Sequence, residues 1–152
     1  MRIILVFLMV LSSQSIAQEV KTESFTISLP DELKVETDRV RRILAFGKNK
    51  NPFINIEFGN GIREQYLDIV SRVNETLARM NSTLSKKDCG ADCEAMYAEG
   101  QIKNESLTVY SYFYLVKAKT QSFIITIVSQ EPINSGELEA TNIGQQILQS
   151  GI

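Results

Sequence analysis

The stretch 107–129 constrains the fold most, because two runs rich in β-branched and aromatic residues are joined there by a short polar link at 117–121. This arrangement is typical of a β-hairpin. Side chains alternate between the two faces of a strand, so the first run presents two different faces. One face carries Leu107, Val109, Ser111, Phe113 and Leu115, and the other carries Thr108, Tyr110, Tyr112, Tyr114 and Val116. We expect other strands to extend this hairpin and helices to cover it.

The row Tyr110, Tyr112 and Tyr114 has two interpretations. Aromatic rings pack well in sheets, so a helix or loop can cover the row as part of the core. Tyrosine is also amphipathic and enriched in interfaces, so a partly exposed row would form a platform for a partner. We therefore name these three tyrosines as partner-binding candidates and keep core packing as the alternative.

Two helices are expected. Apolar residues spaced by threes and fours from Ile62 onward predict a long helix at 63–80. We expect it to pack on the face that carries Val109, Phe113 and Leu115. A weaker helix is expected at 136–149, and its interior Gly144 lowers helix stability by up to about 1 kcal/mol. Whether this second helix covers the tyrosine row is left open.

Alternating patterns predict further strands, joined by short links that imply antiparallel pairing. In the strand expected at 53–58, Phe53, Asn55 and Glu57 share one face, which suggests that the sheet meets solvent there. The other expected strands are 24–29, 40–46 and 94–103. Segments 19–23, 33–38 and 82–92 are expected to be a polar lead-in, a turn or short irregular piece, and a polar loop. The order predicts an α+β fold: a mainly antiparallel sheet of about six strands, one long helix and a C-terminal helix, in an α/β/α sandwich-like arrangement.

The N-terminus has the features of a secretory signal peptide. Arg2 precedes an apolar run at 3–11, and Ser15 and Ala17 form a small-x-small cleavage site. An uncleaved anchor is the alternative, but a run of about 9 residues falls short of the roughly 20 that span a bilayer. We expect a signal peptide at 1–17, a single domain at 18–152, a periplasmic or secreted location and no membrane span after cleavage.

Composition argues against a nucleic-acid partner. The chain has 16 basic and 18 acidic residues, so loss of Arg2 with the signal leaves 15 minus 18, or −3. Basic residues cluster only at 39–42 and 48–50. A protein that binds the phosphate backbone needs a broader positive face.

The two cysteines, Cys89 and Cys93, are separated by three residues. In an oxidising compartment a disulfide is the expected state. A redox pair is the alternative, although such motifs usually have two intervening residues. A tetrahedral metal site is not expected, because the chain has no histidine and no third cysteine.

The sequence offers little catalytic machinery. Histidine, the commonest general base, is absent, and neither a Gly-rich phosphate loop nor a nucleophile elbow occurs. We therefore expect no catalytic residue and no cofactor. The alternative is a periplasmic hydrolase that uses paired carboxylates, such as Asp31/Glu32 or Glu137/Glu139, or a thiol-redox accessory enzyme that uses the cysteine pair.

The segment 25–31, Phe-Thr-Ile-Ser-Leu-Pro-Asp, together with the order of elements, resembles the PsbP-like superfamily, which also includes bacterial DcrB-type proteins. Glu32 and Leu33 stand where many members have a small residue and a tryptophan. The resemblance implies a small non-catalytic module with an antiparallel sheet between helices. It also implies a protein partner. We expect an exported protein-binding module of the bacterial cell envelope, of the interaction, assembly or immunity type.

Overall fold

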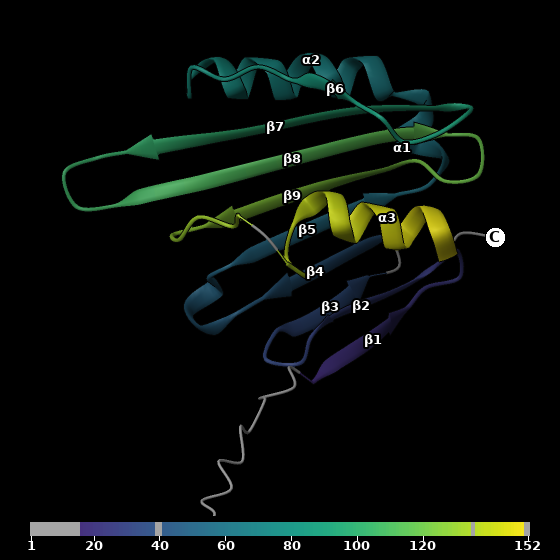
Figure 1. Cartoon of the computed structure of the whole chain (residues 1–152), viewed down its shortest axis with the longest axis horizontal. Coiled ribbons are helices and arrows are strands. Elements are labelled where there is room, and N and C mark those ends of the chain that lie inside the picture. The colour runs from purple at the N-terminus through teal and green to yellow at the C-terminus, as the bar shows by residue number, and fades with distance from the viewer. Residues whose placement is uncertain (1–15, 39–40, 135, 151–152) are drawn as a thin grey trace, which may run out of the picture.

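The computed structural model describes residues 16–38, 41–134 and 136–150. The expected signal peptide therefore lies almost wholly outside the described residues. The architecture is α+β, as the sequence predicts: an antiparallel sheet, a separate two-stranded hairpin and helices that pack on the sheet (Figure 1).

The main sheet has seven strands in the order β3-β4-β5-β9-β8-β7-β6, and every neighbouring pair is antiparallel. The predicted central hairpin is confirmed, with β8 and β9 in register from Tyr110 opposite Ser129 to Val116 opposite Phe123. The strands are β3 (Lys34–Asp38), β4 (Arg42–Phe46), β5 (Phe53–Phe58), β6 (Ser85–Lys87), β7 (Cys93–Lys103), β8 (Thr108–Ala118) and β9 (Phe123–Ser129). A short 3₁₀ turn, η1 (Lys48–Lys50), lies in the β4–β5 link.

The main sheet has seven strands where about six were expected, and three polar segments that were not expected to be strands also pair. The lead-in forms β1 (Ala17–Lys21), which pairs with β2 (Thr26–Pro30) in the two-stranded sheet. The expected turn at 33–38 contains β3, and the expected loop at 82–92 contains β6. All three lie at sheet edges, where backbone pairing on one side suffices and few side chains need burial.

The long helix begins earlier than expected and is interrupted. Its two parts are α1 (Asn60–Glu64) and α2 (Tyr66–Ala78), and between them Gln65 leaves helical geometry at φ −100° and ψ 13°. The C-terminal helix, α3 (Ala140–Ser150), starts after the expected position. Tyr66, Ile69 and Leu77 of α2 pack on Phe113 and Leu115, as predicted for that face.

The opposite face of the sheet is covered by α3 and the β1–β2 hairpin together. Ile27 and Leu29 of β2, with Ile143 and Ile147 of α3, enter one core with the inward residues of the sheet. α3 also supplies hydrogen bonds to the edge of β2. Ser28 N–H donates to Gln146 Oε1 at 2.7 Å, and Ser150 Oγ donates to Thr26 O at 2.7 Å. This layer is therefore held by both apolar packing and edge pairing.

Candidate functional site

Two of the three candidate tyrosines lie inside the core beneath α3. Tyr112 is 6% exposed and Tyr114 is 2% exposed. Tyr112 Oη accepts a hydrogen bond from Ile133 N–H at 2.7 Å, and the Tyr114 ring stacks edge-on to Phe123 with centroids 6.1 Å apart. Core packing, the alternative that the sequence left open, describes the position of these two rings. A partner could reach them only by displacing α3 or the loop after β9.

Tyr110 is the member of the row that keeps an exposed edge. It is half-buried and lines a shallow cavity of about 360 Å³ together with Tyr112, Gln101 and Pro132. The cavity continues around the outer edge of β7 to Met80 at the end of α2. Tyr110 therefore stays a partner-binding candidate, next to a strand edge.

The cysteines form the expected disulfide, with Cα atoms 5.7 Å apart. It closes the loop that leads into β7, where Gly90 adopts φ +97° and donates its N–H to Asp88 Oδ1. Both half-cystines contact the core beneath α3. The bridge thus fixes the start of β7 against the sheet.

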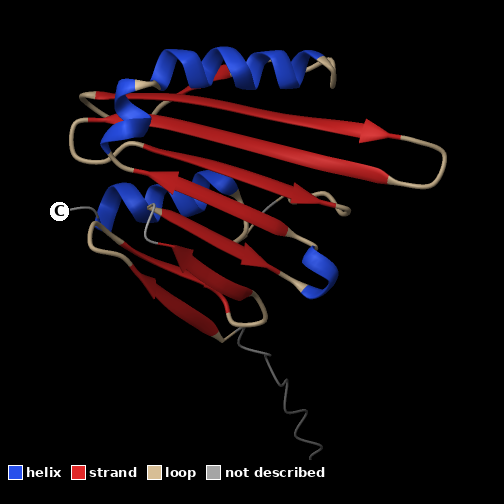
Figure 2. Cartoon of the chain, turned by 180° about the vertical axis from the view of Figure 1, so that it is seen from behind, coloured by secondary structure: helices blue, strands red, loops and turns tan. Residues whose placement is uncertain are grey.

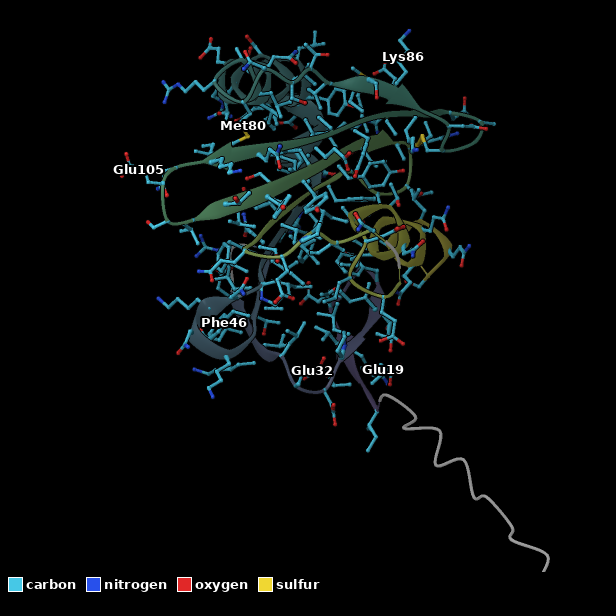
Figure 3. All side chains as sticks on the ribbon, turned by 60° about the vertical axis from the view of Figure 1, so that its left-hand side comes forward. Glu19, Glu32, Phe46, Met80, Lys86 and Glu105 are labelled. Atoms are coloured by element: carbon cyan, nitrogen blue, oxygen red, sulfur yellow. A yellow bond between two sulfur atoms is a disulfide. The ribbon has the colours of Figure 1, made fainter. Side chains whose placement is uncertain are left out.

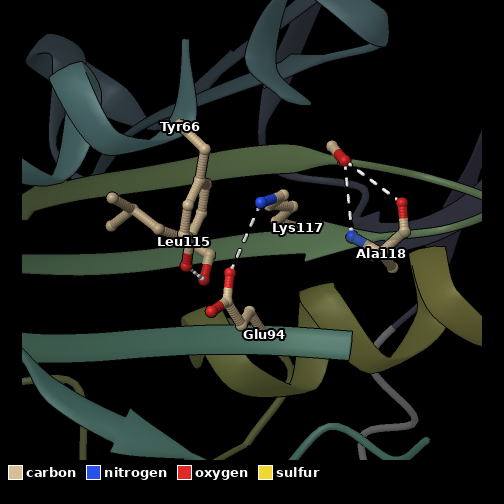
Figure 4. Close-up of polar contacts among 6 residues, drawn as sticks. Tyr66, Glu94, Leu115, Lys117 and Ala118 are labelled. Atoms are coloured by element: carbon tan, nitrogen blue, oxygen red, sulfur yellow. Dashed lines mark hydrogen bonds and ion pairs between the residues drawn. The ribbon is translucent and has the colours of Figure 1, made fainter. Parts of the chain in front are cut away.

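Beside the disulfide, a polar group of side chains links β7, β8 and α2 (Figure 4). Lys117 Nζ lies 3.7 Å from Glu94 Oε2 and 5.8 Å from the centroid of the Tyr66 ring. Tyr66 Oη donates to Leu115 O at 3.3 Å. Burial, and then the nearby Glu94 carboxylate, raise the pKa of Tyr66 to about 12. The phenol therefore stays protonated at neutral pH and acts as a donor that anchors α2, which is a structural role.

The feature that most resembles a binding surface is on the face of the sheet opposite α3. On this face α1 and α2 cover only part of the sheet. Figure 2 shows α2 along the β7 end of the sheet, while β9, β5 and β4 extend beyond it without a covering helix. We call this region the open face. Its apolar members are half-buried, and they are Leu44 and Phe46 of β4, Phe53 of β5 and Val128 of β9.

The open face holds an unpaired acceptor near its centre. Asn55 lies opposite Leu44 on one side and Thr126 on the other. Its Nδ2 donates to Glu57 Oε1 at 2.9 Å. Its Oδ1 is buried and has no hydrogen-bond partner among the described residues. A buried amide oxygen without a donor is unfavourable in the folded protein.

A groove of about 610 Å³ joins the open face to the helices. Ile69 and Val73 of α2, with Ile124 of β9, supply apolar lining. Arg41 and Arg72 also line the groove, and neither forms an ion pair with another residue in the described ranges. Glu57 and Thr126 belong to both the groove and the open face, so the two form one continuous surface.

The border of this surface is basic, although the whole chain is acidic. Lys34 pairs with Glu36 at 2.8 Å, and Arg42 pairs with Asp38 at 2.7 Å, so these charges largely cancel. In the lining of the groove, two basic residues, Arg41 and Arg72, lie with one acidic residue, Glu57. A positive border around an apolar centre is complementary to a partner whose apolar contact is ringed by carboxylates.

Within the described ranges, no helix is long and apolar enough to cross a membrane. The same ranges hold no group of three or more side chains suited to a metal ion.

Comparison with known proteins supplies a fold and nothing more specific. The sequence matches no known protein family, and no curated protein is similar in sequence. A crystal structure of a protein from Bacteroides thetaiotaomicron VPI-5482 is similar, with a TM-score of 0.52 and 14% identity. The match covers 80% of this chain and 43% of that chain, so the present chain spans less than half of that protein. The resemblance to the PsbP-like superfamily stays a prediction.

The sequence contained a partial signal for the open face. The polar members of the alternation at 53–58 indicated that one side of the sheet meets solvent. The apolar members Leu44, Phe46 and Val128 gave no such signal, because half-buried and buried apolar residues follow the same pattern. Their exposure depends on the position of α2 over the sheet, which the local sequence pattern does not predict.

Proposed function

We propose that the protein is an exported, non-catalytic protein-binding module of the bacterial cell envelope, an interaction, assembly or immunity-type factor. The partner is a protein with an apolar patch bordered by carboxylates. The docking surface is the open face together with the groove beneath α2. The observation that carries this proposal is the uncovered sheet surface at Leu44, Phe46, Phe53 and Val128.

The apolar centre would supply the affinity. Phe46 and Phe53 lie directly opposite each other on neighbouring strands, and Lys34 Nζ lies 5.4 Å from the centroid of the Phe46 ring. Aromatic side chains in this setting act as interface anchors, because they bury a large area at a small cost in rotamer entropy.

The basic border would supply orientation and partner choice. Arg41 and Arg72 present guanidinium groups that can engage a carboxylate in a bidentate manner. Charges at the rim of an interface mainly affect association rate and specificity, and their effect falls with ionic strength. Binding is therefore expected to weaken as salt increases.

Site-specific photocrosslinking in the native host tests the proposal. A benzophenone side chain replaces Phe53 on the open face or, as a matched control, Leu67, which is 76% exposed on α2. We expect one protein to crosslink at position 53 and none at position 67. Arg72→Glu should reduce that crosslink severalfold, because it reverses the charge at the border. Equal crosslinking at both positions, or none at position 53, would contradict the proposal.

A further inference from the structure

The outer edge of β7 is uncovered over its last four residues. β6 pairs only with Ala95 to Tyr97, whereas β7 continues to Lys103. Beyond β6, Ser82 Oγ donates to Glu99 O at 2.6 Å. No hydrogen bond from the described residues reaches the outer edge of β7 after Glu99. Figure 3 shows Glu105 at the end of the β7–β8 hairpin and Met80 beside β7. The uncovered edge therefore runs from Gly100 to Lys103.

The direction of the free backbone groups follows from the bonds around them. In an antiparallel strand, the N–H and C=O of one residue point to the same side, and the next residue points to the other side. The carbonyls of Tyr97 and Glu99 accept bonds from Ser85 and Ser82, which lie on the side of β7 away from β8. The β7–β8 register is regular, so the backbone groups of Gln101 and Lys103 point to the same side as those of Tyr97 and Glu99. Their backbone N–H and C=O groups therefore point away from β8.

The side chains along this edge are self-complementary. If two copies of β7 pair antiparallel about Gln101, then Gln101 lies opposite itself, Glu99 lies opposite Lys103, and Gly100 lies opposite Ile102. Ser82 already bonds to Glu99 O, so the backbone pairing is centred on Gln101 and the Glu99–Lys103 contact is one between side chains. Opposite charges in directly facing positions stabilise an antiparallel pair. Glu99 and Lys103 both lie on exposed positions, and no ion pair of Lys103 occurs in the described part of the chain.

The apolar residues fit the same register. Ile102 is 50% exposed, although it is a large apolar side chain. Gly100 has no side chain, and the Met80 Sδ atom lies only 2.7 Å from where its Cβ would be. Met80 fills the space over Gly100, so Ile102 of a second copy would lie opposite Gly100 and against Met80. The pairing would thus bury an exposed isoleucine twice, once in each copy.

We propose that the protein forms a homodimer through β7, with the two sheets joined edge to edge about Gln101. The two-fold axis is perpendicular to the sheet, so the two open faces lie on the same side of the joined sheet. The contact is isologous and closes on itself, which limits the assembly to two copies. The paired segment is short, so we expect a weak, concentration-dependent dimer.

The other edge of the sheet lacks this complementarity. On β3, Lys34 already pairs with Glu36, and Asp38 with Arg42, within one chain. Antiparallel self-pairing about the middle of β3 would place Glu36 opposite Glu36. Like charges in facing positions are destabilising, so the structure favours β7 and not β3 as the joining edge.

Charge exchange at the edge tests the proposal by sedimentation equilibrium of the purified protein, from about 10 µM to about 1 mM, a range suited to weak dimers. Glu99→Lys and Lys103→Glu should each weaken the dimer about tenfold, because each places like charges opposite one another twice. An equimolar mixture of the two variants should restore dimers, since every facing pair is then complementary. Glu64→Lys, the same charge change at an exposed position of α1, should leave the dimer unchanged.

Several outcomes would overturn the proposal. Wild-type protein that stays monomeric over the whole range would do so, as would a dimer that neither edge variant weakens. Failure of the mixture to restore dimers would exclude the register about Gln101. Loss of the dimer in Phe53→Thr would assign the contact to the open face instead. None of these results depends on the partner proposed above, so the two proposals fail separately.

Discussion

The two faces of the main sheet carry similar apolar side chains but are covered very differently. On one face, α3 and the β1–β2 hairpin bury Ile54, Ile56 and Ile125 completely. On the other, α2 covers Phe113 and Leu115, while Phe53 and Val128 stay half-buried. The comparison teaches that the strand pattern decides which residues share a face. The placement of helices decides which face is core and which is available for binding.

The covered face also shows why α3 lies where it does. A Cβ at Gly144 would lie 2.6 Å from Tyr114 Cδ1 and 3.1 Å from Phe123 Cε2. The glycine that weakens the helix in isolation therefore allows the close approach of α3 to the tyrosine row. No helix lies over β4 and β5 on the open face (Figure 2).

The largest effect is expected for Tyr112→Ala on the covered face. Loss of the buried ring should lower the free energy of unfolding by about 3–5 kcal/mol, by analogy with other large aromatic truncations. Urea unfolding followed by circular dichroism measures this change. Tyr112→Phe is the matched control and should cost only about 1 kcal/mol, for the bond from Ile133 N–H. A small effect of Tyr112→Ala would mean that the ring is not core.

The next largest effect on stability is expected for Gly144→Ala. Alanine improves helix propensity by about 1 kcal/mol, but its methyl group collides with the buried rings of Tyr114 and Phe123. Overpacking of this kind costs about 1–3 kcal/mol, so the net effect should be destabilising. Thermal unfolding gives the sign directly. A stabilised Gly144→Ala would show that α3 can move away from the sheet at little cost.

A smaller loss is expected for Gln146→Ala. This change removes the side-chain acceptor for Ser28 N–H and should destabilise by about 1 kcal/mol. Hydrogen exchange should accelerate at Ser28, while the buried strand β9 keeps its protection. Gln149→Ala, at an exposed position of the same helix, is the matched control. Equal losses of stability from Gln146→Ala and Gln149→Ala would show that the loss does not come from the hydrogen bond to Ser28.

The smallest effect on stability is expected for Phe53→Thr on the open face. The residue is half-buried, so the free energy of unfolding should fall by less than about 1 kcal/mol. The neighbouring Ile54→Thr, on the covered face of the same strand, should cost about 2–3 kcal/mol. Phe53→Thr should nevertheless abolish binding of the crosslinked partner. Equal stability losses for Phe53→Thr and Ile54→Thr would contradict the difference in burial between the two faces.

Several features of the fold were predictable because they depend on local pattern. Alternation identified the central hairpin, and the spacing of apolar residues identified α2 and the face on which it packs. Edge strands β1, β3 and β6 were missed, because one paired side and an exposed polar face leave no apolar alternation to detect. The interruption at Gln65 was missed for a similar reason, since the apolar spacing continues across it.

For the candidate site, the sequence alone determined the α+β class, the close cysteine pair and the two faces of each strand. Only the tertiary structure decided that Tyr112 and Tyr114 are core, that Phe46 and Phe53 remain accessible and that the edge of β7 is uncovered. The physical reason is that burial is a property of packing between distant segments. Alternation sorts residues between two sides of a strand, but whether a helix lies over a side depends on contacts that no local pattern encodes.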